Sequence, residues 1–146
     1  MKSMFGENIS IVAAHPDDEV IGMGGTIKKL TSQGKNVSVL FLSDGVSSRK
    51  NLRESAVSRR ESAISALGKL DCFSVDFAEF PDNKLDSVPL LDICKVIESY
   101  FVRTRPSAVF THFPFDLNID HRIVSEAVSV ASRPKSMSTI QQLFFF

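Results

Sequence analysis

Six consecutive residues, "AHPDDE" (14–19), place one imidazole beside three carboxylates. They directly follow the apolar run "ISIVAA" (9–14), which is typical of a strand buried on both faces. Neighbouring carboxylates repel one another and are costly to remove from water. The stretch therefore predicts a positive partner, and a metal dication would offset much of the repulsion.

Reactive side chains follow two other apolar runs. Ser43 and Asp44 follow "VSVLFL", and Thr111 and His112 lie at the end of "SAVFTHF". The next loop adds four more such residues: Asp116, Asn118, Asp120 and His121. All three histidines of the chain thus fall in segments that follow strands. Open α/β sheets bind ligands outside the carboxyl ends of their strands, so we expect one shared site there.

The spacing of His15 and Asp18 indicates a metal site. Across a turn that contains proline, one nitrogen and one carboxylate oxygen converge, and Asp17 points elsewhere. His121 is the best candidate for a third ligand. Two histidines and one carboxylate leave a coordination position open for water, as catalytic metal sites do. Zn²⁺ suits these ligands best, and Fe²⁺ and Mn²⁺ remain alternatives.

The other carboxylates of the motif have candidate roles near such a metal. A bound metal lowers the pKa of its water, and Asp17 would accept the proton as a general base. Glu19 either orients a ligand or is an N-terminal helix residue favoured by the helix dipole.

Rival chemistries fit the sequence less well. The stretch "GMGGT" (22–26) lacks the G-x-G-x-x-G spacing of a dinucleotide loop, and no G-x-S-x-G elbow is present. Asp17 as a phosphoryl-accepting nucleophile, with Asp18 on Mg²⁺, would leave His15 unexplained.

Strand and helix patterns alternate along the chain, which favours an α/β fold with a parallel sheet covered on both faces. We expect strands over 9–14, 37–42, 73–80 and 107–113, and helices over 20–30, 51–70, 87–105 and 121–132. The period-two pattern of 73–80 indicates an exposed or edge strand, and the tail could begin a last one. At 146 residues, one domain over 1–146 is expected.

Composition excludes several classes of partner. Seventeen basic and seventeen acidic residues give no net charge and no basic stripe, which argues against nucleic acid or an anionic membrane as partner. No apolar run is long enough to span a membrane, and the first ten residues do not resemble a signal peptide. Cys72 and Cys94 lack metal-like spacing and read as reduced thiols, so a cytoplasmic location is expected.

Four segments resemble, in order, the PIG-L/LmbE-like family of zinc-dependent de-N-acetylases: "AHPDDE", "IGMGGTI", "LFLSDG" and "THFPFDLNIDHRIVSEAV". The resemblance spans about residues 9–128. It implies a Rossmann-like three-layer sandwich with a mainly parallel sheet, expected in the order 3-2-1-4-5. It also implies hydrolysis of the acetamide of N-acetylglucosamine-type groups on small molecules or glycoconjugates.

The resemblance assigns roles by position. His15, Asp18 and His121 match the family's zinc ligands, and Asp17 matches its catalytic base. Asp120 matches a carboxylate behind the ligands. Arg59 and Arg60, in "RRES", match a segment that helps to hold substrate, and the sequence does not choose between them.

The chain departs from the family pattern in two places. Asn118 stands where many members have a histidine, so the acid role passes to Asp17, which we favour, or to His112. An amide such as that of Asn118 can still donate a hydrogen bond to an oxyanion. Members usually continue beyond the last helix, so we expect a C-terminally truncated version of the fold.

The sequence thus predicts a metal-dependent amidohydrolase that removes an acetyl group from an N-acetylated sugar. Asn118 or His112 would help the metal to stabilise the oxyanion. Asp44 would either bind sugar hydroxyls or serve only as a turn residue. The alternative is a non-catalytic domain that binds metal or sugar, and a homo-oligomer is possible in either case.

Overall fold

The computed structural model describes residues 5–46, 56–136 and 138–146, so positions 51–55 of the expected second helix lie outside it. The strands are β1 (Asn8–Ala13), β2 (Asn36–Ser43), β3 (Ser74–Phe80), β4 (Ala108–Thr111) and β5 (Gln142–Phe145). The helices are α1 (Asp18–Ser32), α2 (Ala56–Lys69), α3 (Leu90–Thr104) and α4 (Ile119–Ala131), with a 3₁₀ turn η1 (Leu85–Ser87) before α3.

The strands form one five-stranded sheet in the order β3-β2-β1-β4-β5, and every pairing is parallel. This confirms the expected α/β class and strand order. β1 lies at the centre and pairs with both β2 and β4. The chain proceeds from β1 toward one edge and later returns to the other side, so the carboxyl ends of β1 and β4 flank the switch point.

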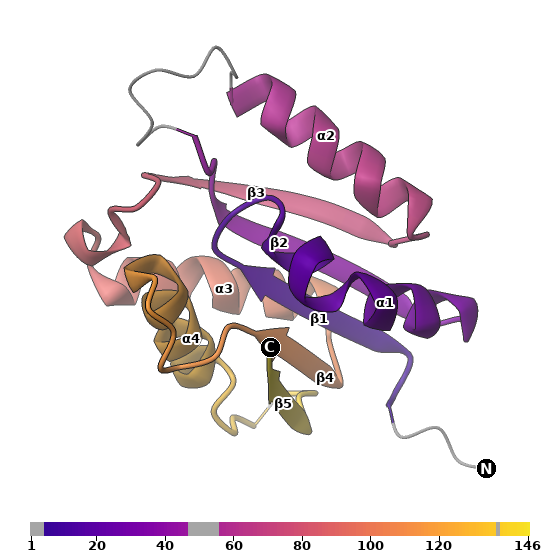
Figure 1. The fold of residues 1–146 in the computed structure, drawn as a ribbon. Coiled ribbons are helices and arrows are strands. Elements are labelled where there is room, and N and C mark those ends of the chain that lie inside the picture. The colour runs from indigo at the N-terminus through magenta and orange to yellow at the C-terminus, as the bar shows by residue number, and fades with distance from the viewer. Residues whose placement is uncertain (1–4, 47–55, 137) are drawn as a thin grey trace.

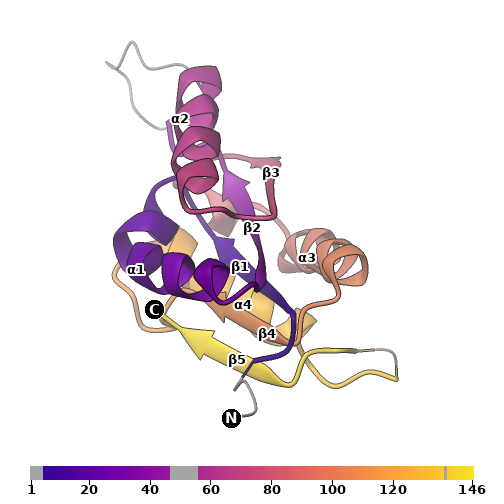
Figure 2. The same ribbon diagram turned by 90° about the vertical axis from the view of Figure 1, so that its right-hand side faces the viewer.

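Helices cover both faces of the sheet, as Figures 1 and 2 show. α1 and α2 cover one face, and α3 and α4 cover the other. α1 presents Met23, Ile27 and Leu30 to the sheet, at the helical spacing of one buried stripe. Each such side chain contributes roughly 1.5–3 kcal/mol when it is fully buried.

The central strand explains why "ISIVAA" is almost wholly apolar. Ile9, Ile11 and Ala13 pack under α1 and α2, whereas Val12 and Ala14 pack under α3 and α4. Side chains of a strand alternate between faces, so a strand covered on both sides needs apolar residues throughout.

Element boundaries differ from the expected ones where proline or a loop intervenes. The helix expected over 87–105 begins only at Leu90, because Pro89 occupies its N-cap with an extended backbone. It ends at the left-handed Arg105, just before Pro106, as expected. β4 stops at Thr111, so His112 lies just beyond the strand. The tail forms β5, parallel to β4.

Within the described residues, no helix is both long and apolar enough to cross a membrane. The cytoplasmic location and the possible homo-oligomer remain predictions.

Candidate metal centre

Three side-chain atoms from three segments form a small triangle at the carboxyl ends of β1 and β4. His15 follows β1, Asp18 is the first residue of α1, and His121 lies in the first turn of α4. His15 Nδ1 lies 3.4 Å from Asp18 Oδ2. His121 Nε2 lies 3.3 Å from Asp18 Oδ2 and 3.3 Å from His15 Nδ1. The structure therefore brings together the three residues predicted as metal ligands.

The side lengths of this triangle suit a small divalent ion. Two ligand atoms that are each 2.0–2.1 Å from a tetrahedral ion lie about 3.3–3.4 Å from one another. All three sides of the triangle have this length. Two imidazole nitrogens and one carboxylate oxygen are also ligands that zinc accepts, with a fourth position left for water. The residues present thus fit the metal that the sequence predicts.

Each ligand histidine has a carboxylate at its other ring nitrogen. His15 Nε2 lies 3.1 Å from Asp120 Oδ2 and 3.2 Å from Asp82 Oδ1. His121 Nδ1 lies 3.2 Å from Asp116 Oδ2. Such partners fix the tautomer and the ring orientation of metal-binding histidines and make them more basic. They leave Nδ1 of His15 and Nε2 of His121 free to bind an ion.

His15, Asp82 and Asp120 also lie close enough together to form a metal cluster of their own. However, both oxygens of Asp120 already accept backbone N–H groups, Oδ2 from Asn83 at 2.7 Å and Oδ1 from Leu85 at 3.1 Å. Asp120 is fully buried in this arrangement. We therefore interpret Asp82 and Asp120 as hydrogen-bond acceptors for His15, not as a second metal site.

The pKa values of the three predicted ligands reflect these contacts. Burial lowers the pKa of His15, but its hydrogen bonds to Asp120 and Asp18 outweigh burial and raise the pKa to about 9. Burial also opposes the charge of Asp18, but His121 and His15, which both face its Oδ2, outweigh burial, so the pKa of Asp18 lies far below its usual range. For His121, Asp18 and Asp116 together outweigh burial and raise the pKa. The raised pKa values of His15 and His121 favour positively charged rings beside Asp18.

Asp17 lies beside the triangle and forms an ion pair with Arg59 through Oδ2. Its backbone φ is 147°, an unusual value for a residue other than glycine. The side chain is 43% exposed and lines a pocket of about 250 Å³ together with the three predicted ligands, Arg59 and Asn118. Asp17 is therefore available to a small molecule in the pocket, unlike the buried Asp120.

Glu19 supports the turn and does not touch the triangle. It is fully buried, and its Oε2 accepts the backbone N–H of Asp17 at 3.1 Å. Burial raises the pKa of its carboxyl group to about 7. From the sequence, Glu19 was expected either to orient a metal ligand or to interact with the helix dipole. Its hydrogen bond to the Asp17 N–H indicates a third role, which is to hold the backbone of the "AHPDDE" turn.

His112 lies behind His121. The two rings stack with centroids 3.9 Å apart and an angle of 8° between planes. His112 Nε2 accepts the backbone N–H of Ala14 at 2.8 Å, so its proton is on Nδ1. Nε2 also lies 3.4 Å from Asp18 Oδ2, but a backbone amide is always a donor, and the shorter bond decides the tautomer. The geometry favours a supporting role over proton transfer through Nε2.

Asn118 caps α4 and faces the pocket. Its side-chain Oδ1 accepts the backbone N–H of Asp120 at 2.9 Å, and its backbone N–H donates to Asp116 Oδ1 at 2.8 Å. The cap uses only the amide oxygen, so the amide NH₂ group could serve as a donor toward a bound molecule.

The remaining predicted substrate residues lie in a neighbouring pocket. Arg60 pairs with Glu79 at 3.3 Å, and its guanidinium lies over the ring of Phe77. Asp44 Oδ1 accepts the backbone N–H of Val46 at 2.9 Å, as in an Asx turn. Both line the pocket between α2 and β3. Arg59, rather than Arg60, therefore lies at the candidate metal centre.

Sequence reasoning missed Asp82 and Asp116 as partners of the ligand histidines. Asp82 lies in "PDNKLD", whose composition is typical of a turn. It follows β3, so the strand-end rule that singled out the other acidic residues applied to it as well. Asp116 was noted in its loop, but its spacing of five residues before His121 gave no helical signal.

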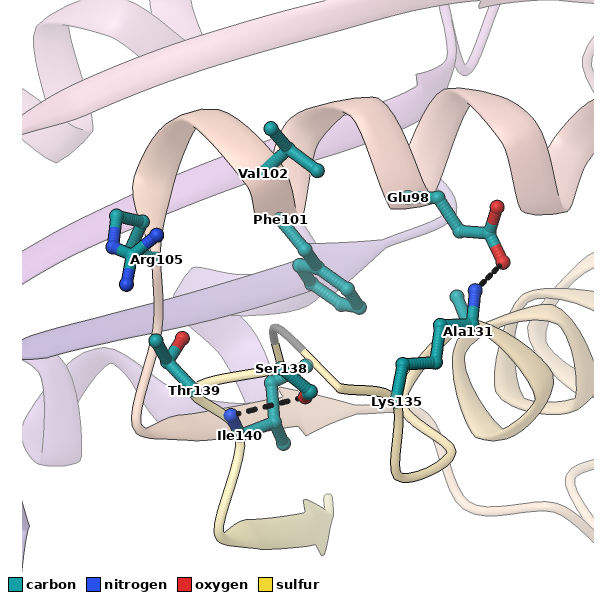
Figure 3. Close-up of a pocket in the computed structure, with 9 residues that line it drawn as sticks. All are labelled: Glu98, Phe101, Val102, Arg105, Ala131, Lys135, Ser138, Thr139 and Ile140. Atoms are coloured by element: carbon teal, nitrogen blue, oxygen red, sulfur yellow. Dashed lines mark hydrogen bonds and ion pairs between the residues drawn. The ribbon is translucent and has the colours of Figure 1, made fainter.

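A separate pocket of about 190 Å³ lies between α3, Lys135 and residues 138–140, away from the triangle (Figure 3). Its lining is mostly apolar, and its one carboxylate, Glu98, pairs with Lys135. This pocket lacks the side chains for metal chemistry.

With the geometry established, comparison with known proteins identifies the family. Residues 10–132 match the sequence profile of the PIG-L family, described as GlcNAc-PI de-N-acetylase. The chain belongs to the PIG-L family. Over 139 residues this PIG-L chain is 31% identical to the diacetylchitobiose deacetylase of Thermococcus kodakarensis, an alignment that covers 88% of the chain and 51% of the deacetylase.

Solved structures share the fold. The conserved protein TT1542 from Thermus thermophilus superposes with a TM-score of 0.81 at 23% identity, over 96% of this PIG-L chain and 66% of TT1542. GalB, the 4-carboxy-2-hydroxymuconate hydratase of Pseudomonas putida, gives a TM-score of 0.70 at 25% identity, over 87% and 56% of the two chains. The chain thus spans about half of its Thermococcus relative, and the same fold occurs in a hydratase.

Proposed function

We propose that this chain is a metal-dependent hydrolase that removes the N-acetyl group from an N-acetylglucosamine-type sugar or its conjugate. The observation that carries the proposal is the triangle of His15 Nδ1, Asp18 Oδ2 and His121 Nε2, whose sides of 3.3–3.4 Å suit a tetrahedral ion. The Thermococcus relative, named as a diacetylchitobiose deacetylase, supports the choice of an acetamide substrate.

His15, Asp18 and His121 would hold the metal, and Zn²⁺ is proposed over Fe²⁺ and Mn²⁺. When bound, such an ion supplies Lewis acidity, which polarises a carbonyl and makes a nearby water more acidic. The carboxylates behind the two histidines keep the rings oriented for this role.

Asp17 is the proposed general base. Its carboxylate lines the same pocket as the ligands, and Arg59 holds it through Oδ2. Oδ1 of Asp17 would accept the proton of the attacking water. Because Asn118 cannot release a proton, Asp17 would then return that proton to the leaving amine.

Asn118 is the proposed donor to the substrate carbonyl oxygen. Its Oδ1 is fixed by the N-cap of α4, which orients the NH₂ group of the same amide. A fixed donor costs little reorganisation when negative charge develops on the oxygen. His112 is a weaker candidate for this role because its Nε2 already accepts the Ala14 N–H.

The alternative is a domain that binds metal or sugar without turnover. The alignment with the Thermococcus relative covers only 51% of that deacetylase, so similarity alone does not carry the relative's activity over to this chain.

Acetate release distinguishes these functions. Purified chain loaded with Zn²⁺ would be incubated with N-acetylglucosamine and with N,N'-diacetylchitobiose, and acetate would be measured. The proposal expects release that is lost with the metal and falls by at least about 10³-fold in Asp17→Asn, with the metal still bound. Stoichiometric Zn²⁺ without acetate release from either sugar would contradict the hydrolase and support the binding domain.

A further inference from the structure

Phe146, which follows β5, lies unusually close to the candidate metal centre. Its ring centroid is 5.1 Å from that of His112, and the two planes are inclined at 47°. His112 in turn stacks on the metal-ligand candidate His121 at 3.9 Å. The three rings form a continuous series of ring contacts that leads from β5 to the site.

The backbone of Phe146 also holds His112 from both sides. The Phe146 N–H donates to the carbonyl oxygen of Thr111 at 2.9 Å, and the Phe146 carbonyl accepts the N–H of Phe113 at 3.0 Å. These bonds fix the peptide groups before and after His112. On its other side, His112 Nε2 accepts the Ala14 N–H at 2.8 Å.

Gly22 of α1 leaves room for the Phe146 ring. A Cβ atom placed on Gly22 would lie only 2.5 Å from Cδ2 of Phe146, a distance that no real contact adopts. Gly25, three residues later on the same helix, has no atom within 4 Å of such a Cβ position. An alanine at position 22 would thus force the Phe146 ring to shift, whereas an alanine at position 25 would meet no neighbouring atom.

We propose that Phe146 is a positioning residue for the metal centre, which acts by holding His112 against the ring of His121. The inference rests on the metal site of the proposed function but not on the hydrolysis itself. Gly22 is the structural counterpart of Phe146, because the absence of a side chain at position 22 allows the ring to reach His112. β5 thereby takes part in ordering the site, although it supplies no ligand.

Co²⁺ binding to the purified chain tests this inference, with affinity taken from competition with a chelator and geometry from the visible absorption of the bound ion. Phe146→Ala should weaken Co²⁺ binding by about 10-fold or more, the effect expected when an outer partner of a ligand is lost. The absorption band should also change shape, because His121 is less well fixed. Phe146→Leu refills the space, so it should restore most of the Co²⁺ affinity and most of the original shape of the absorption band.

Matched variants separate positioning from folding. Phe145 points to the other face of β5 and is 45% exposed, so Phe145→Ala should leave affinity and spectrum unchanged. Gly22→Ala displaces the ring with a single methyl group and should act like Phe146→Ala. Gly25→Ala should bind Co²⁺ as the unsubstituted chain does. Both alanines improve helix propensity, so Gly22→Ala remains informative if Phe146→Ala does not fold.

The outcomes are distinct. Gly22→Ala or folded Phe146→Ala with unchanged affinity and spectrum would overturn the positioning role and leave the proposed function standing. Failure of the unsubstituted chain to bind Co²⁺ would overturn the metal site itself, and the positioning role with it.

Discussion

His15 and His121 are 106 positions apart in the sequence, and their Nδ1 and Nε2 atoms lie 3.3 Å apart. Two things cause this proximity. β1 and β4 are adjacent parallel strands whose carboxyl ends share one edge of the sheet. Asn118 is the N-cap of α4, so His121 lies in the first turn of that helix, close to the same edge. Asp18 Oδ2, at 3.3–3.4 Å from both nitrogens, completes the site.

Loss of the carboxylate behind His15 should weaken metal binding. In Asp120→Asn the side chain keeps one acceptor for the backbone but no longer carries the charge that faces His15 Nε2. We expect Zn²⁺ affinity to fall by about 10–100-fold, as measured by chelator competition. Asp86→Asn, in the exposed turn η1, is the control. Equal affinity of the Asp120→Asn and unsubstituted chains would show that His15 needs no such partner.

Metal affinity should rise with pH. In the metal-free chain the pKa of His15 is about 9, so at neutral pH a bound ion has to displace its proton. Affinity should therefore increase from pH 6 until His15 is deprotonated near pH 9. Calorimetry in buffers of different ionisation enthalpy should detect proton release at pH 7. Binding without proton release there would contradict the protonated state of His15.

The metal-free chain should show the opposite trend in stability. Because folding raises the pKa of His15 from its ordinary value of 6.5, the stabilisation from its protonated form is fully present below pH 6.5. It is lost as the pH rises through about 9. Thermal unfolding in the presence of a chelator should thus show a lower Tm at pH 9 than at pH 6.5, and Zn²⁺ should reverse the difference. If the Tm of a His15→Gln chain fell equally between pH 6.5 and pH 9, the pH dependence would come from groups other than His15.

Arg59 and Arg60 should differ in their effect on turnover. Arg59→Gln removes the partner of Asp17 and should lower kcat by about 10-fold or more, because the base is no longer held in place. Arg60→Gln removes a surface pair with Glu79 and should leave kcat unchanged. Acetate release from N-acetylglucosamine provides the measurement. A larger loss of kcat in Arg60→Gln than in Arg59→Gln would instead indicate that the substrate binds in the pocket between α2 and β3.

The Asn118 amide should matter for catalysis more than for folding. Asn118→Ser keeps an N-cap acceptor for the Asp120 N–H but lacks the amide donor. We expect Tm to change little and kcat to fall by about 10²–10³-fold, as when one oxyanion donor is removed. A large drop in Tm with unchanged kcat would limit Asn118 to its capping role.

The sequence predicts the ligand set because the chemistry is local to strand ends. Buried parallel strands are recognised from "ISIVAA" and "VSVLFL", and the parallel geometry then brings His15 and His121 to one edge. The strand order follows from the family resemblance, since periodicity alone does not rank strands within a sheet.

The supporting contacts were less predictable, because they depend on three-dimensional packing. Arg59 and Arg60 are adjacent, and only the placement of α2 shows that Arg59 reaches Asp17 while Arg60 lies over Phe77. The residues around Asp82 are typical of a turn and do not indicate its contact with His15, which depends on the pairing of β3 with β2. The contact of Phe146 with Gly22 joins segments that no spacing rule connects.

A crystal structure of the chain with Zn²⁺, with anomalous diffraction recorded at the zinc edge, tests the central claim most directly. We predict one anomalous peak about 2.0–2.2 Å from His15 Nδ1, Asp18 Oδ2 and His121 Nε2. A zinc ion bound elsewhere, or one whose ligands omit His15 or His121, would contradict the metal centre described here.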